Sequence, residues 1–348
     1  MSMFTPLSGL LGGGLIGLAA DILLLGNGDI MGASGIVSTT VLQPKSQPRW
    51  KWVFLSSFLT TATFVLAPRL SSSASAEGRT LSTLGYALAG LFVGFGTKLG
   101  NGCTSGHGIC GLGRFSKRSL VAVLTFMATG ITTAIITSPK SAFSGATEVL
   151  RTTEPPADNS IDIGMAISVA SLIAAFVAPS ILKSGKESPD DKAKIPGAAV
   201  AGSVFAAGLH ISQMAVQVKV HNFLDMSLML ENAWDPTLMM VMGGGLAFSF
   251  LAYQLIPEYR VLKAKSSSSC THPMALSKES TFKNIPKNAN AVIDSNLVVG
   301  AALFGVGWGI GGICPGPAIL LAGYGTMPVI TAWWPSFFVG SYMAQKLK

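Results

Sequence analysis

Charged side chains are scarce in this chain. Asp, Glu, Lys and Arg make up 11% of its 348 residues, whereas 49% of the residues are hydrophobic. Soluble domains carry roughly 25% charged residues, so the composition excludes a water-soluble globular fold. Apolar runs long enough to cross a bilayer, which takes about 20 residues for a helix, recur along the whole chain. We therefore predict an all-α polytopic membrane protein that lies in the lipid bilayer.

The apolar runs predict about nine transmembrane helices, several of them broken or re-entrant. They lie at residues 6–26 paired with 30–42, and at 52–68, 81–100, 119–138, 161–182, 196–216, 236–256, 292–313 and 326–345. A charged linker, 183–195, separates a predicted N-terminal membrane half, 1–182, from a predicted C-terminal membrane half, 196–348. The second half contains a polar loop at 257–290. The start of the chain lacks a basic region, so we expect no cleavable signal peptide.

The few charges are mostly basic, with a net charge of +8. The loops 43–51, 113–118, 183–195 and 257–290 hold 16 Lys and Arg residues, whereas the loops 69–80 and 139–160 hold 4. Basic residues collect in cytoplasmic loops, and this bias explains the charge without a nucleic-acid partner. We therefore place the basic loops in the cytoplasm and predict a multi-pass protein of the cell membrane.

Cysteine is also rare, with four residues in the chain. This number and its spacing do not match a secreted disulfide framework. Cys270 lies in a polar Ser-rich loop and is interpreted as an incidental thiol. Cys103, Cys110 and Cys314 lie in glycine-rich interruptions of apolar sequence.

The stretch 98–118, KLGNGCTSGHGICGLGRFSKR, is the richest in chemistry. Each glycine costs a helix roughly 1 kcal/mol relative to alanine, so this segment predicts broken backbone at membrane depth. Such backbone is tolerated where it lines a polar cavity. The candidate site residues in and around the stretch are Gly102, Cys103, Thr104, Ser105, His107 and Cys110.

Carboxylates are absent from residues 90–120 and 297–330. A Na⁺ or Ca²⁺ site needs oxygen ligands, so the missing acids argue against one. Half-helix N-termini carry a partial positive charge that suits an anion, and thiols are polarisable contacts that suit a sulfur-bearing ligand. The residues therefore favour a soft anion as the ligand, with no cofactor.

Two segments share the pattern G-x-G-x-x-x-G-x-x-Cys, at 94–103 and at 305–314. Cys103 and Cys314 then stand 211 residues apart, and we infer an internal repeat. If the first repeat contains an odd number of crossings, the second is inverted. Inverted repeats whose broken helices meet at the midplane are a device of transporters.

Other interpretations of these residues remain open. Cys103, His107, Cys110 and Cys314 could ligate zinc or copper, although their spacing matches no familiar zinc pattern, and the two repeat cysteines could form a redox disulfide. His107 could serve as a structural hydrogen-bond donor and Cys110 as a small buried hydrophobe.

Several residues outside the motifs have structural interpretations. Asp29 and Asp235 are predicted helix caps, with Pro236 in the first turn. His210 and His221 are interpreted as packing residues. The methionines at 239, 240 and 242 are interpreted as core residues, with a soft substrate path left open.

The runs GCTSGHGICGLGRFS and GVGWGIGGICPGPAI resemble the two cysteine motifs of the YeeE/YedE family of sulfur-transport membrane proteins. The stretches KVHNFLD and WDPTLMMVMGGG resemble half-size permeases related to that family, so the chain resembles a fusion of two such units. The resemblance implies uptake of thiosulfate or a related ion along pore cysteines. It implies a substrate site at Cys103 and Cys314, with Gly102 and Thr104 beside the first and Pro315 and Gly316 after the second.

Some members of that family carry a further cysteine in the first broken helix. This chain has none before Cys103, so a relay of three thiols would need Cys110 in that place.

The sequence therefore predicts a non-enzymatic permease for thiosulfate or a similar small sulfur anion, with a cytoplasmic sulfur-carrier protein as a further partner. Two alternatives stand beside it. One is a membrane sulfurtransferase that carries a persulfide on Cys103. The other is a non-selective channel for small anions.

Overall fold

The computed structural model describes residues 4–69, 80–138, 151–152, 165–170, 192–255 and 293–348. The predicted polar loop 257–290, with Cys270, lies outside the described residues. Most of the predicted span 161–182, of the loop 139–160 and of the linker 183–195 also lies outside them.

The described residues form helices in nearly every predicted span. The elements in chain order are α1 (Pro6–Asn27), α2 (Ala33–Leu42), η1 (Pro44–Ser46), α3 (Arg49–Thr60), η2 (Thr61–Leu66), η3 (Ala67–Arg69), β1 (Thr80–Leu81), α4 (Thr83–Gly100), η4 (Thr104–Gly111), α5 (Lys117–Ile136), β2 (Arg151–Thr152), α9 (Ile195–Ile211), α10 (Gln217–Leu224), η5 (Met226–Glu231), α11 (Thr237–Phe250), η6 (Leu251–Leu255), α13 (Ser295–Gly311), α14 (Pro315–Gly323), η7 (Val329–Trp333) and α15 (Trp334–Leu347). The two-residue strands β1 and β2, which the sequence did not predict, pair antiparallel.

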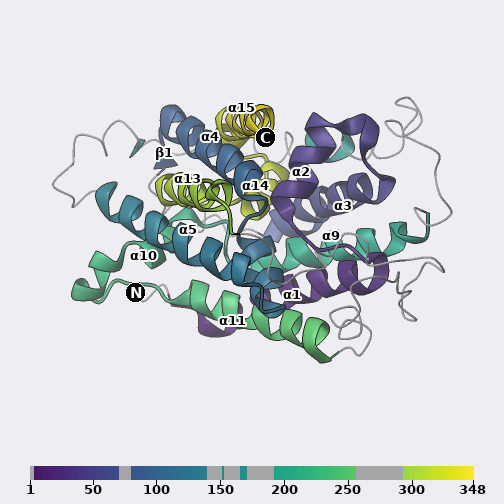
Figure 1. Cartoon of the computed structure of the whole chain (residues 1–348), viewed down its shortest axis with the longest axis horizontal. Coiled ribbons are helices and arrows are strands. Elements are labelled where there is room, and N and C mark those ends of the chain that lie inside the picture. The colour runs from purple at the N-terminus through teal and green to yellow at the C-terminus, as the bar shows by residue number, and fades with distance from the viewer. Residues whose placement is uncertain (1–3, 70–79, 139–150, 153–164, 171–191, 256–292) are drawn as a thin grey trace.

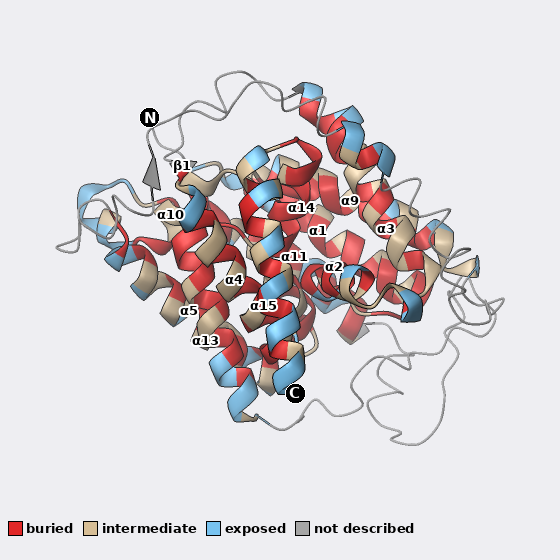
Figure 2. Ribbon diagram, turned by 90° about the horizontal axis from the view of Figure 1, so that it is seen from above, coloured by how far each residue is buried: buried red, intermediate tan, exposed pale blue. Residues whose placement is uncertain are grey.

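The prediction of an all-α polytopic membrane protein is confirmed. Among the described residues, four helical stretches are long and apolar enough to cross a membrane: Pro6–Asn27, Lys117–Ile136, Thr237–Gln254 and Ser295–Gly323. Two shorter apolar helices, α2 and α9, accompany them. Large hydrophobic side chains such as Leu7, Leu124 and Val200 point outward and are exposed. Figure 2 shows exposed and buried positions alternating along the helices, as expected when lipid surrounds the bundle.

Helices from distant parts of the sequence lie side by side. In Figure 1, α4 lies between α13 and α15, and α5 packs on the other face of α13. A second group joins α1 to α9 and α11, with α3 against α9. The helices α1 and α4 come before the linker 183–195 in the sequence. Their main neighbours, α9 and α11 for α1 and α13 and α15 for α4, come from the C-terminal part of the chain. The N-terminal and C-terminal parts of the chain are therefore interleaved.

Glycines let two pairs of these helices approach closely. A Cβ at Gly96 would collide with the backbone of Phe304, and one at Gly300 would collide with the backbone of Gly100. Residue numbers rise along α4 as they fall along α13, so these two helices run antiparallel. Small residues at helix interfaces are typical of membrane bundles, in which close van der Waals packing holds the helices together.

The helices α1 and α11, in contrast, run parallel. A Cβ at Gly13 would collide with the backbone of Val241, and one at Gly17 would collide with Gly245. Both pairs advance by four residues, which is about one helical turn. A residue of α1 therefore faces the residue of α11 whose number is 228 higher, at both contacts.

Charged residues at helix ends tie elements together. The Asp294 carboxylate accepts a hydrogen bond from Leu297 N–H at the start of α13, and Arg118 Nη1 donates to it across 3.0 Å from α5. Slight burial acts to raise the pKa of Asp294, but the hydrogen bond and charge of Arg118 outweigh it, and the pKa lies below its ordinary value. Asp29 forms an ion pair with Lys194 at 3.2 Å, and the N-cap of α2 is Gly32. The prediction that Asp29 caps this helix is therefore wrong.

Asp235 stands one residue before the N-cap of α11, which is Pro236. Its carboxylate nevertheless accepts a hydrogen bond from Thr237 N–H at 2.9 Å. The sequence analysis therefore predicted correctly that Asp235 stabilises this helix start. The residue stands one position before the N-cap and not at it.

Candidate functional site

The first cysteine motif is a helix break. The helix α4 ends at Gly100, and Asn101 takes a left-handed conformation with φ of 62°. The chain is then extended at Cys103, and a π-helix, η4, follows from Thr104 to Gly111. Asn and Gly are the residues that enter the left-handed region most readily, which explains why the helix stops here. The predicted break is present, but it covers only three residues before a wide helical turn resumes.

The second cysteine motif repeats this local structure. The helix α13 ends at Gly311, Gly312 is left-handed with φ of 62°, and Cys314 is extended before α14 begins at Pro315. Gly312 stands 211 residues after Asn101, the same separation as between the two cysteines. Proline at the first helical position has no N–H to leave unsatisfied and is preorganised for the helix, so α14 starts directly after the thiol.

The two breaks meet inside the protein. Thr104 donates a hydrogen bond through Oγ1 to the sulfur of Cys314 across 3.5 Å, although the residues are 210 positions apart. On the other side, Cys103 Sγ lies 3.2 Å from Ser105 Oγ. The first turn of η4 therefore contacts both repeat cysteines. Both are free thiols, and Cys103 is 2% exposed.

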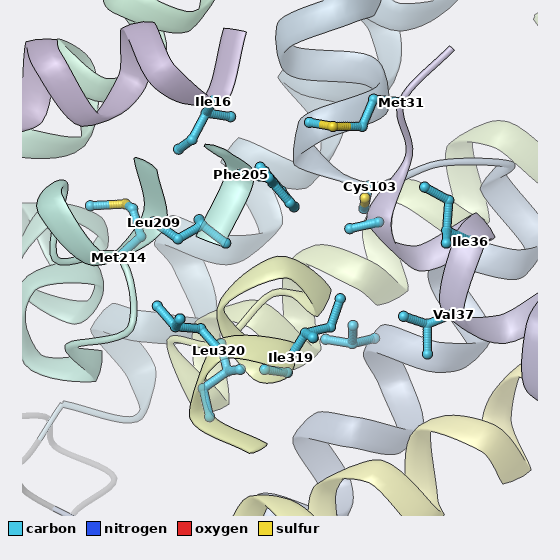
Figure 3. Packing of buried hydrophobic residues seen from close by; sticks show 14 of the residues in the cluster. Ile16, Met31, Ile36, Val37, Cys103, Phe205, Leu209, Met214, Ile319 and Leu320 are labelled. Atoms are coloured by element: carbon cyan, nitrogen blue, oxygen red, sulfur yellow. The ribbon is translucent and has the colours of Figure 1, made fainter. Parts of the chain in front are cut away.

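A cavity of about 330 Å³ opens next to Cys314. Thr104, Ser105 and Gly316 are also part of its wall, and the rest is almost entirely apolar. The other lining residues are Ile16, Ile109, Val123, Phe126, Met127, Phe205, Leu209, Met214, Val220, Phe223, Leu238, Met239, Val241, Met242, Trp308, Gly312 and Pro317. Figure 3 shows the packing around this region, with Ile16, Phe205, Leu209 and Met214 on one side and Cys103 with Met31 and Ile36 on the other.

His107 holds the break in place. Its Nδ1 lies 3.1 Å from Ser119 Oγ in α5, and its Nε2 lies 3.3 Å from the carbonyl oxygen of Gly100. Its ring also packs against Gly102, where a Cβ would come within 2.6 Å of it. The imidazole thus joins the end of α4 to α5 through two hydrogen bonds, and it is not part of the cavity wall.

Cys110 lies at the far end of η4 and is fully buried. Its thiol donates to the carbonyl oxygen of Met31 at 3.7 Å. Among the described residues, no group of three or more His, Cys, Asp or Glu side chains is placed so that it could hold a metal ion.

The sequence did not single out most of the cavity wall. Met127, Met214, Met239 and Met242 contribute four thioethers from three different parts of the chain. The sequence had flagged the methionines near 240 only as core residues with a soft path left open. These methionines come together because of how α5, α9 and α11 pack. No local sequence pattern predicts that packing. His221, interpreted as a packing residue, does pack, against Gly312.

Comparisons with known proteins agree with this architecture. Residues 194–339 match a family of unknown function, DUF6691. A probable transporter of Xylella fastidiosa, strain Temecula1, is 43% identical over 129 residues, which are 36% of this chain and 90% of that protein. A probable transporter of strain 9a5c is 35% identical over 133 residues, which are 38% of this chain and 77% of that protein.

The chain belongs to the family of these probable transporters. The aligned residues cover most of each relative but little more than a third of this transporter-family protein. The relatives are therefore much shorter than it is. The helical membrane architecture and the buried pair of helix breaks described above are consistent with membership of a transporter family.

Proposed function

We propose that this protein is a permease for thiosulfate or a related small sulfur-containing anion, which passes between the thiols of Cys103 and Cys314. The observation that carries the proposal is the contact between the two breaks. Thr104, next to one repeat cysteine, donates to the sulfur of the other. Cys314 also lines the cavity, and Cys103 contacts the same turn of η4 through Ser105. Thiols from opposite halves of the chain that both touch one helical turn are suited to hold a soft anion.

The polar groups at this point are suited to replace the hydration shell of an anion. The N-termini of η4 and α14 both begin next to a repeat cysteine, and helix N-termini favour negative charge. The hydroxyls of Thr104 and Ser105 add two further donors. Gly316 is part of the cavity wall and Gly102 precedes Cys103 in the first break, and neither adds a side chain that would compete with the anion for space. Pro315 has no backbone N–H at the start of α14.

We also propose that the two halves are inverted repeats. Gly94 meets the backbone of Phe337, and Gly305 meets the backbone of Phe126. Gly94 and Gly305 are 211 positions apart in the sequence, and so are Phe126 and Phe337. Together with the antiparallel arrangement of α4 and α13, this reciprocity supports a pseudo-two-fold axis between the halves.

The short relatives support an origin by fusion of two half-size units, which divide at the linker 183–195. A cytoplasmic sulfur-carrier protein fits as the acceptor of the imported sulfur. No covalent step is needed for passage, which favours a permease over an enzyme.

Uptake of radiolabelled thiosulfate by cells that lack their own sulfur porters tests the proposal. We expect Cys103→Ala and Cys314→Ala each to lower uptake about tenfold or more, which corresponds to about 1.4 kcal/mol of lost interaction. Cys270→Ala, in the Ser-rich loop, is the matched control and should transport normally. Unchanged uptake by both repeat-cysteine variants would disprove the site.

Two further measurements separate the alternatives. Excess sulfate should compete poorly with thiosulfate, because a thiol prefers the softer ion, and equal competition would indicate a non-selective channel. Mass spectrometry of protein incubated with thiosulfate should find no stable sulfur adduct on Cys103. Such an adduct would instead indicate a sulfurtransferase.

A further inference from the structure

A second polar cluster lies at the opposite end of η4 from the repeat cysteines. Its centre is Asp21, an acid within the membrane-spanning helix α1. Asp21 is only 7% exposed, and its Oδ1 makes no hydrogen bond with the part of the chain that the structure describes. Ionisable side chains inside spans are costly, and their retention indicates a functional role.

Ser249 of α11 belongs to the same cluster. The parallel register of α1 and α11 pairs Gly17 with Gly245. Continued by one turn along both helices, this register gives Asp21 and Ser249 corresponding positions. The side chain of Ser249 is fully buried, and its hydroxyl also has no hydrogen-bond partner among the described residues. Two packed helices therefore each carry, at corresponding positions, a buried polar group that has no hydrogen-bond partner among the described residues.

No described cation neutralises Asp21 by an ion pair. The helix α11 carries no ionisable residue, and the only one in α9 is His210, which is hydrogen-bonded to Tyr324 at 2.6 Å. On the η4 side, Cys110 interacts electrostatically with both Asp21 and Arg114, and it contacts Tyr253. A carboxylate in this position would be a buried charge with no ion-pair partner among the residues that the structure describes.

We propose that Asp21 binds and releases a proton during each transport cycle, and thereby couples uptake of the anion to a proton gradient. This inference rests on the proposed function. A proton is the cation that fits, because it neutralises one carboxylate without further ligands. A sodium ion would need several oxygen ligands around it.

The backbone links this cluster to the repeat cysteines. The far end of η4 is held where Cys110 donates to the carbonyl oxygen of Met31. The near end is held where Ala33 N–H donates to Ser105 Oγ across 3.4 Å, and Ser105 contacts Cys103. Segment 31–33 therefore bridges both ends of one π-helical element. A change of charge at Asp21 can shift η4 and so alter the contacts of the thiols, and π-helical turns are frequent at functional sites.

Labelling with a hydrophobic carbodiimide tests the proton site without any substrate. This reagent modifies protonated carboxyls in apolar surroundings. Peptide mass spectrometry should find Asp21 labelled at about neutral pH, with labelling that declines as the pH is raised. Asp29, paired with Lys194, is the internal control and should stay unlabelled. Absence of label on Asp21 in the folded protein would overturn the proposal.

Proteoliposomes with the membrane potential held at zero test the coupling. An inward proton gradient should concentrate thiosulfate in wild-type vesicles by about tenfold per pH unit for one proton per anion. Asp21→Asn should abolish this accumulation, yet exchange labelled thiosulfate at equal pH within about twofold of wild type. Asp29→Asn is the control and should still accumulate substrate. Accumulation by Asp21→Asn, or accumulation driven only by a sodium gradient, would contradict the proposal.

These outcomes separate the two proposals. If wild-type vesicles neither exchange nor accumulate thiosulfate, the proposed substrate is wrong, and the labelling result alone decides whether Asp21 carries a proton. Should Asp21→Asn fail to fold, Asp21→Glu keeps the carboxyl and should retain both the label and the proton response. Loss of both in a folded Asp21→Glu protein would argue against a proton site.

Discussion

At the scale of single residues, the hydroxyl of Thr104 connects two otherwise separate motifs. It comes from the residue after one repeat cysteine and donates to the sulfur of the other. Under the proposed function, this hydroxyl either orients the Cys314 thiol or turns toward the anion when substrate is present. Its loss should therefore affect affinity for the anion more than folding.

Thr104→Val should weaken thiosulfate binding about fivefold, since a net hydrogen bond contributes about 1 kcal/mol. Thr104→Ser keeps the hydroxyl and should bind within about twofold of wild type. Concentration dependence of uptake in the two variants provides the measurement. Equal affinity of the valine and serine variants would show that the hydroxyl plays no part in binding.

Sequence reasoning worked at this scale where chemistry and local pattern coincide. It singled out Cys103, Cys314 and Thr104 from the repeat and from the glycine-rich context, and their functional roles stay predictions. It left Met127 and Met214 unmentioned, because a methionine in an apolar span looks the same whether it faces lipid, core or cavity. It assigned Asp29 a local cap, whereas the actual partner is Lys194, far along the chain.

At the scale of elements, the order of the long helices followed from apolar runs, and the breaks after α4 and α13 followed from the two glycine-rich cysteine motifs. The separate short helix α10 was not predicted. The π-helical form of η4 did not follow. Glycine density predicted broken backbone throughout the stretch, but a wide helical turn resumes at Thr104 because surrounding helices pack on it. Tertiary packing thus overrode local propensity in the segment that carries the site.

The contact between α4 and α13 should be sensitive to one added methyl group. Gly96→Ala places a Cβ against the backbone of Phe304, which cannot move independently of its helix. We expect destabilisation of about 1–3 kcal/mol from overpacking. Gly243→Ala in α11, where a Cβ would meet nothing within 4 Å, is the matched control and should leave stability unchanged or raise it.

Thermal unfolding in detergent measures both variants. A melting temperature for Gly96→Ala equal to that of Gly243→Ala would mean that the two helices can separate slightly at no cost. In that case the close antiparallel approach would not be a requirement of the fold.

At the scale of the whole molecule, the two parts of the chain are interleaved rather than adjacent. Helix α4 contacts α13 and α15, and α1 contacts α9 and α11. Composition and span count predicted the membrane class, and the charged linker 183–195 indicated two halves. Interleaving of those halves could not be read from the sequence, since it depends on contacts between residues about two hundred positions apart.

Separately expressed segments 1–182 and 196–348 should assemble when produced together. Their mutual interface includes several long helix pairs, and relatives of about half this size suggest that such units can exist as separate chains. Co-purification through a tag on one segment measures assembly, and thiosulfate uptake measures recovery of function. A pair cut inside α13 is the control and should not assemble.

If the two segments fold but stay apart, the covalent connection is essential to the assembly. The linker 183–195 would then mark a change in amino-acid composition, and not a boundary between two units that can assemble as separate chains. Recovery of uptake by the co-expressed segments would instead support two independent units.

The four thioethers around the cavity carry a chemical consequence of their own. Oxidants convert methionine to its sulfoxide, which turns a flexible apolar side chain into a polar one and is reversed only by dedicated reductases. A small oxidant that entered this chamber would meet the four methionines and the Cys314 thiol, whereas the buried thiol of Cys103 is not part of the wall. The chamber wall would then take up the damage, and its repair would restore the lining while the inner cysteine stayed reduced.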